Sequence, residues 1–229
     1  MTHTIIPHLV KKDLLIWRKM ISIFCLMSLL AIAGLSLIYG HIPNFVFMNV
    51  GFTILIVPTA ACGIALLIQT NVFEKEKSTQ VFIMSLPITV KEFTLAKLLV
   101  NLPVFGALWI VTAGVAFYFT FGLGLLPLGA VPFITMIFLG IFAAYSCILS
   151  ISLVSQSLST TIWGIMFFEA GTSAYLWIVA FLDPIKNTIY GPNTVWNSTA
   201  ITIVAIQVLV IVFVLVGTIF IQNKKRDFI

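Results

Sequence analysis

The chain has 229 residues, of which 61% are hydrophobic and only 8% are charged, and its formal net charge is +5. About a quarter of the residues of a soluble globular domain are charged, so this composition excludes an ordinary soluble enzyme or binding domain. It predicts an all-α integral membrane protein.

Six apolar runs are long enough to cross a bilayer as helices. About 20 residues are needed, because the hydrocarbon core is about 30 Å thick and a helix rises about 1.5 Å per residue. Little sequence remains for a soluble domain, so we expect a single transmembrane domain over residues 1–229. The predicted transmembrane helices are 20–39, 50–68, 98–120, 131–151, 161–182 and 199–221.

The basic residues lie near the ends of these runs and predict the orientation of the chain. If the N-terminus is cytoplasmic, every Lys and Arg except Lys186 falls on the cytoplasmic side. Cytoplasmic connections of membrane proteins are enriched in Lys and Arg, so both termini are expected in the cytoplasm. Topology therefore explains the net charge, and we expect membrane lipids but no nucleic acid as partners.

Residues 1–19 precede the first run and show the periodicity of an amphipathic helix. Lys12 and Arg18 lie on a polar face, whereas Leu9 belongs to an apolar face. Such a segment is typical of a helix lying on the membrane surface, and Asp13 is the residue that departs from the pattern.

Residues 71–97 form the most highly charged segment between two apolar runs. From Glu74 to Met84 the pattern predicts a short charged helix with Val81 and Met84 on its apolar side. Pro87 disfavours helical geometry in the residue before it, so we expect a turn at Leu86.

A second helix is expected to begin directly after this turn. Thr89 is followed three residues later by Glu92, which is the spacing of a capping box. The helix that they cap would continue into the third span and could act as a lever between the charged segment and the membrane.

Four polar residues lie within the predicted spans and are candidates for a substrate path or a subunit interface. Glu169 is the only Asp, Glu, Lys or Arg in any of the six runs, and a charged residue at the centre of a span costs about 2.5–3.5 kcal/mol. Its carboxyl group must therefore face protein or water, or be protonated. Thr172 and Ser173 share its helix face, and Gln207 in the last span is better explained by helix packing.

Enzymatic motifs are missing from the sequence. It contains no GxxxxGK[ST] phosphate loop, no HExxH and no GxSxG. We therefore predict that the chain is not an enzyme and binds neither a cofactor nor a metal ion.

The segment 71–97 resembles the signature of ABC-2 type transporter permeases. In that family an acidic and basic run is followed by a Leu-Pro turn, an acidic residue and a lysine that opens the third span. The resemblance implies a membrane domain that pairs with a second copy or a paralogue and binds two separate ATPase subunits, which carry ATP and Mg. It assigns coupling to the ATPase to Glu74, Lys75, Glu76, Lys77, Val81, Met84, Leu86 and Pro87.

The same resemblance implies a function and a location. We expect the permease subunit of an ATP-driven exporter of hydrophobic or amphipathic cargo, such as toxins or antimicrobial peptides, in a bacterial plasma membrane. The outer segment 183–198 corresponds to short re-entrant helices in the family but is short for that role. A proton-coupled secondary transporter that uses Glu169 and a non-transporting membrane scaffold or sensor are the alternatives.

Overall fold

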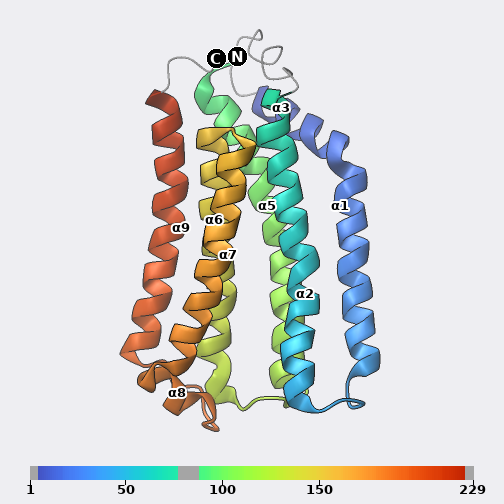
Figure 1. Ribbon diagram of the computed structural model, residues 1–229, viewed down its shortest axis with the longest axis vertical. Coiled ribbons are helices and arrows are strands. Elements are labelled where there is room, and N and C mark those ends of the chain that lie inside the picture. The colour runs from blue at the N-terminus through green and yellow to red at the C-terminus, as the bar shows by residue number, and fades with distance from the viewer. Residues whose placement is uncertain (1–4, 77–87, 225–229) are drawn as a thin grey trace.

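The computed structural model describes residues 5–76 and 88–224 as a bundle of roughly parallel and antiparallel helices (Figure 1). Six of these helices are long and apolar enough to cross a membrane, which confirms the expected number of spans. The chain is thus a multi-pass membrane protein of helical fold. The six helices are α1 (Ile5–Ile38), α2 (Asn44–Leu67), α5 (Val90–Phe117), α6 (Val131–Ser155), α7 (Leu158–Phe181) and α9 (Ser198–Lys224).

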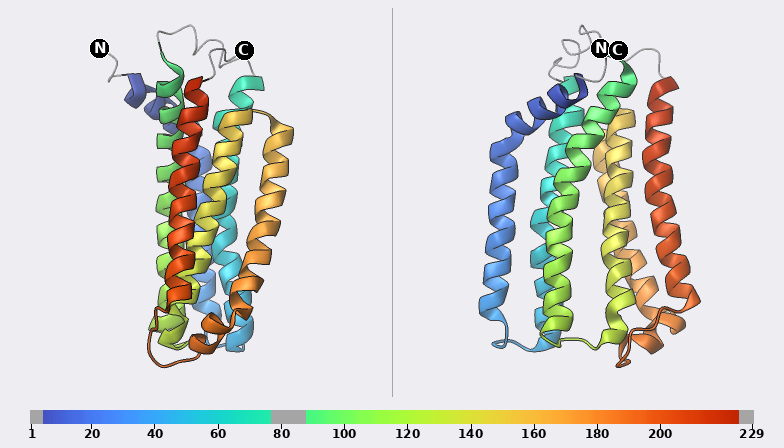
Figure 2. Two further views of the ribbon diagram at one scale, coloured as in Figure 1. Left: turned by 90° about the vertical axis from the view of Figure 1, so that its left-hand side faces the viewer. Right: turned by 180° about the vertical axis from the view of Figure 1, so that it is seen from behind.

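The long helices form two sets of three. In one set α1 packs against α2 and α5, and in the other α6 packs against α7 and α9. Packing of α5 against α6 and α9 joins the two sets. As a result α1 and α9 occupy opposite edges of the bundle, as Figure 2 shows from behind.

The first turns of α1 do not form a separate helix, because α1 runs without interruption from Ile5 into the first span. Figure 2 shows these turns bent away from the axis of the rest of α1 and lying across one end of the bundle. Leu9 packs there against Phe93 and Ala96 of α5. The apolar face expected for residues 1–19 therefore covers the start of the third span.

Two spans end in a turn of π-helix. The α2 helix passes into η2 (Ile68–Val72) and then α3 (Phe73–Glu76), and α5 passes into η3 (Tyr118–Gly122). Such single π-turns occur often at functional sites. Thr70 and Asn71 of η2 are buried, so this wider turn directs polar side chains into the bundle.

Short helices close the end of the bundle opposite α3. They are η4 (Leu128–Ala130) and α8 (Asp183–Ile189), and α8 folds back beneath the bundle in Figure 1. Ile185 and Ile189 of α8 are buried in a cluster with Met136 of α6 and Ala200 of α9. The predicted outer segment 183–198 thus contains a packed helix, while α7 itself remains helical to Phe181.

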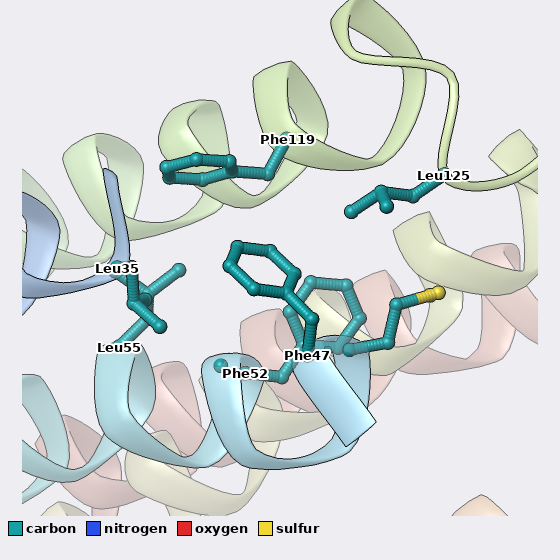
Figure 3. Close-up of a pocket in the computed structure, with 8 residues that line it drawn as sticks. Leu35, Phe47, Phe52, Leu55, Phe119 and Leu125 are labelled. Carbon is teal, nitrogen blue, oxygen red and sulfur yellow. The ribbon is translucent and has the colours of Figure 1, made fainter. Parts of the chain in front are cut away.

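Aromatic packing fills the bundle near this end. Figure 3 shows Phe47 of α2 close to Phe119, and their ring centroids are 5.5 Å apart. The cavity that remains beside them, lined also by Leu35 and Leu125, has a volume of about 10 Å³. That is about the minimum that one water molecule needs, so this cavity is too small for a ligand.

Candidate functional site

Four charged side chains meet at the end of the bundle where α1 begins and α9 ends. We call Lys12, Asp13, Glu74 and Lys97 the charged cluster. The Lys97 ammonium donates hydrogen bonds to Asp13 Oδ2 at 2.7 Å and to Glu74 Oε2 at 2.5 Å. Lys12 Nζ lies 2.9 Å from Glu74 Oε1 and 3.0 Å from Asp13 Oδ1. Two cations therefore alternate with two anions, and the formal charges of the cluster cancel.

The charged cluster is largely removed from water. Lys97 is 2% exposed and Asp13 is 1% exposed, while Lys12 is partly exposed. Buried charges are tolerated when they are paired and hydrogen-bonded, and removing one partner from a buried pair costs about 3–5 kcal/mol. The cluster consequently fixes α1, α3 and α5 to one another, although its bonded partners Asp13 and Lys97 are 84 residues apart in the chain.

A chain of polar contacts continues from the charged cluster into the bundle. Asn101, one turn beyond Lys97, donates from Nδ2 to the Lys97 carbonyl at 2.9 Å and to Thr70 Oγ1 at 3.1 Å. Asn71 Nδ2 then donates to Ser152 Oγ of α6 at 2.7 Å. The π-turn η2 thereby connects α5 and α6 through hydrogen bonds as well as apolar packing.

Helix α5 begins with the capping box that the sequence predicts. Thr89 Oγ1 accepts a hydrogen bond from the Glu92 amide at 3.2 Å, and Glu92 Oε2 accepts one from the Thr89 amide at 2.8 Å. The start of α5 is thus fixed at Thr89, eight residues before Lys97. Whether this helix moves as a lever is a prediction that these contacts do not test.

The predicted coupling residues fall into three groups. The Glu74 carboxylate is engaged by Lys12 and Lys97, whereas Lys75 is exposed at the surface of α3. Glu76 ends α3. The remaining members of the predicted coupling set, Lys77, Val81, Met84, Leu86 and Pro87, lie outside the described residues.

A large groove opens between α2 and α7, both of which stand at the front in Figure 1. It has a volume of about 1210 Å³, and α6 forms its floor with Ile137, Ile141 and Ala144. Drug-sized ligand sites occupy about 300–1,000 Å³, so the groove is large enough for a bulky ligand. Most of the side chains that line it are apolar.

The groove contains three of the polar residues singled out in the sequence. Glu169, Thr172 and Ser173 line it from α7, and Glu169 is exposed. Within the described part of the chain the Glu169 carboxylate has no hydrogen bond or ion pair, whereas Thr172 donates to the carbonyl of Phe168 in its own helix. Glu169 is therefore an available anionic group at the wall of an apolar groove.

Gln207, the fourth polar candidate, lies away from the groove and joins three helices. Its Nε2 donates to the Met136 carbonyl at 2.9 Å and to the Tyr175 hydroxyl at 2.8 Å. The residue is buried between α9, α6 and α7. These contacts agree with the packing role that the sequence favoured.

The charged cluster is the feature that sequence reasoning missed. Lys97 is the lysine that the family resemblance places at the opening of the third span, whereas its partner Asp13 only departs from the amphipathic pattern of residues 1–19. The position of Asp13 could have indicated the charged cluster, because a carboxylate on the packing side of a helix needs a partner. No group of three or more His, Cys, Asp or Glu side chains that could hold a metal ion occurs among residues 5–76 and 88–224.

Comparison with protein-family models, with curated proteins and with solved structures gives no match to this chain.

Proposed function

We propose that this chain is the permease subunit of an ATP-driven exporter and that a separate ATPase subunit moves it. The charged cluster is the observation that carries the proposal. Glu74 precedes residues 77–87 in the chain, and Lys97 follows them. The two side chains bind each other, and each also binds a residue of α1: Glu74 binds Lys12, and Lys97 binds Asp13. A force applied to the intervening segment would therefore reach three helices of the bundle together.

The groove supplies the second element that a transporter needs. It runs between the two sets of three helices, so a change in the angle between the sets would widen or narrow it. Its apolar walls suit hydrophobic or amphipathic cargo. The family resemblance adds the expectation of two ATPase subunits and of a second permease copy or a paralogue.

The orientation of the chain in the membrane is part of the same proposal. The described end that carries Lys12, Lys75, Lys91 and Lys224 would face the cytoplasm of a bacterial cell, in accord with the enrichment of Lys and Arg in cytoplasmic connections. The ATPase would bind at that end, and cargo would leave at the end closed by α8.

ATP hydrolysis by the purified chain tests this proposal. The sequence has no phosphate loop, so the chain should hydrolyse ATP only when it is purified from its native membrane together with a partner. The same chain expressed in an unrelated host provides the matched control and should be inactive. Purification from the native membrane without any nucleotide-binding subunit would contradict the proposal.

A proton-coupled secondary transporter is the second candidate, and the position of Glu169 favours it. A carboxylate in a groove at membrane depth could bind and release a proton. In that case the chain alone, reconstituted in liposomes, should move cargo in response to a pH gradient without ATP, and E169Q should abolish that transport.

A further inference from the structure

We propose that the groove between α2 and α7 binds a lipophilic organic cation and that Glu169 is the counter-ion for its charge. This inference rests on the proposed transport function and names the chemical class of the cargo. It starts from an imbalance of charge, since Glu169 is the only Asp, Glu, Lys or Arg in the six predicted spans. A carboxylate at that depth requires a partner or a proton.

The depth of Glu169 follows from its place in α7. It lies 12 residues before Phe181, the last residue of the helix, and 11 residues after Leu158, the first. At about 1.5 Å per residue, Glu169 is about 18 Å from one end of α7 and about 16 Å from the other. The carboxylate is therefore near the middle of the span.

The basic residue that also lines the groove lies too far along it to pair with Glu169. Lys186 belongs to α8, which begins after α7 ends. About 18 Å of helix thus separates the level of Glu169 from the end where Lys186 lies. Lys186 does not neutralise Glu169, and the charge of the carboxylate remains available to a ligand.

The other walls of the groove suit the apolar body of such a ligand. Aromatic rings from α2, α6 and α7 line it, and aromatic faces attract organic cations in addition to providing apolar contact. Because the groove opens sideways between two spans, a lipophilic molecule can enter it from the membrane. The aromatic members of the lining include Phe52, Phe133, Tyr145, Phe168 and Phe181.

Charge complementarity favours a cation over a second copy of the chain as the occupant. Two copies packed symmetrically through α7 would place the same surface on both sides of the interface. Each copy would then bring Glu169, and the six predicted apolar runs bring no Lys or Arg at that depth to pair with it. A cationic ligand supplies the charge that the second copy lacks.

Binding of tetraphenylphosphonium to the purified chain in lipid nanodiscs tests the inference. We expect saturable binding to the wild-type chain and at least tenfold weaker binding to E169Q. E169D keeps the charge and should stay within about threefold of the wild-type affinity. K186Q is the matched control, because it removes the other groove charge and should not weaken binding.

A neutral probe of similar shape shows whether binding depends on the charge of the ligand or only on its shape. Triphenylphosphine oxide has a similar aromatic body without the net charge, so the wild-type chain and E169Q should bind it equally. Equal affinity of both proteins for tetraphenylphosphonium, or no saturable binding to the wild-type chain, would overturn the inference. A change of oligomeric state in E169Q with unchanged cation binding would assign the groove to a second copy and overturn it as well.

The binding measurement is independent of the proposed ATPase. It uses the chain alone, without ATP, so loss of cation binding in E169Q would stand even if no ATPase subunit were found. Conversely, if the chain is found in a complex with an ATPase but binds no cation, the proposed function would stand and the inference of a cation site would be wrong.

Discussion

Lys97 binds Asp13 through a 2.7 Å hydrogen bond between two almost fully buried charged groups, although 84 residues separate them in the chain. Glu74 completes the contact from the end of the second span. The start of the third span is therefore attached to both preceding spans at the charged cluster. Residues 77–87 connect two members of this cluster, Glu74 and Lys97.

Removal of the charge of Lys97 should destabilise the bundle. In K97M the carboxylates of Asp13 and Glu74 keep only the partly exposed Lys12 as a cation, and breaking a buried pair costs about 3–5 kcal/mol. We expect a clear fall in the apparent melting temperature in detergent. K75M is the control, since Lys75 is exposed and surface substitutions usually change stability by less than about 0.5 kcal/mol.

A double variant tests whether the loss arises from the pair itself. D13N/K97M removes one charge of each sign, so it should be more stable than the sum of the two single variants predicts. Coupling energies between contacting residues are about 0.5–3 kcal/mol. Strictly additive losses would show that Asp13 and Lys97 do not interact.

The capping box should control the local stability of the first turn of α5. T89A removes the oxygen that accepts from the Glu92 amide and should cost about 0.5–2 kcal/mol. Hydrogen exchange of the amides just after Thr89 should accelerate. T202A, which removes an exposed hydroxyl from α9, should leave exchange in α5 unchanged.

Gly63 should tolerate no side chain, because α2 approaches two aromatic rings there. A Cβ at this position would lie 2.6 Å from an atom of Phe105 and 2.7 Å from an atom of Tyr145. Overpacking of this kind costs about 1–3 kcal/mol, so G63A should lower the melting temperature. G114A is the matched control, since nothing lies within 4 Å of that position and alanine favours the helix. Equal melting temperatures for the two variants would contradict this packing.

Charge reversal at Glu74 and at Lys75, two neighbouring residues of α3, should have different effects. E74K would place a third cation beside Lys12 and Lys97, so we expect it to destabilise the bundle itself. K75E alters an exposed residue and should preserve the fold while weakening recovery of the proposed ATPase subunit. If K75E leaves that recovery unchanged, Lys75 is not part of the contact.

The sequence predicted the features that depend on neighbouring residues. Six apolar runs predicted the six long helices, and the spacing of Thr89 and Glu92 predicted the capping box. The long helices and the capping box both depend on residues close together in the chain, so periodicity and spacing in the sequence are enough to predict them. Glu169 and Gln207 also stand out in the sequence, because they are polar residues within apolar runs.

The features that were missed depend on how distant helices pack. The contact between Asp13 and Lys97 joins residues 84 positions apart, and neither residue alone specifies its partner. The groove exists because α2 and α7 stand apart over α6, which no local pattern encodes. The π-turn at Thr70 and Asn71 is likewise fixed by contacts with α5 and α6.

Native mass spectrometry of the complex extracted from its own membrane tests the central claim most directly. The account predicts an assembly that contains the 25.3 kDa chain, a second copy or a paralogue, and two nucleotide-binding subunits. Detection of the chain alone, or of a dimer without any nucleotide-binding subunit, in a preparation that remains folded would contradict the claim that a separate ATPase drives this protein.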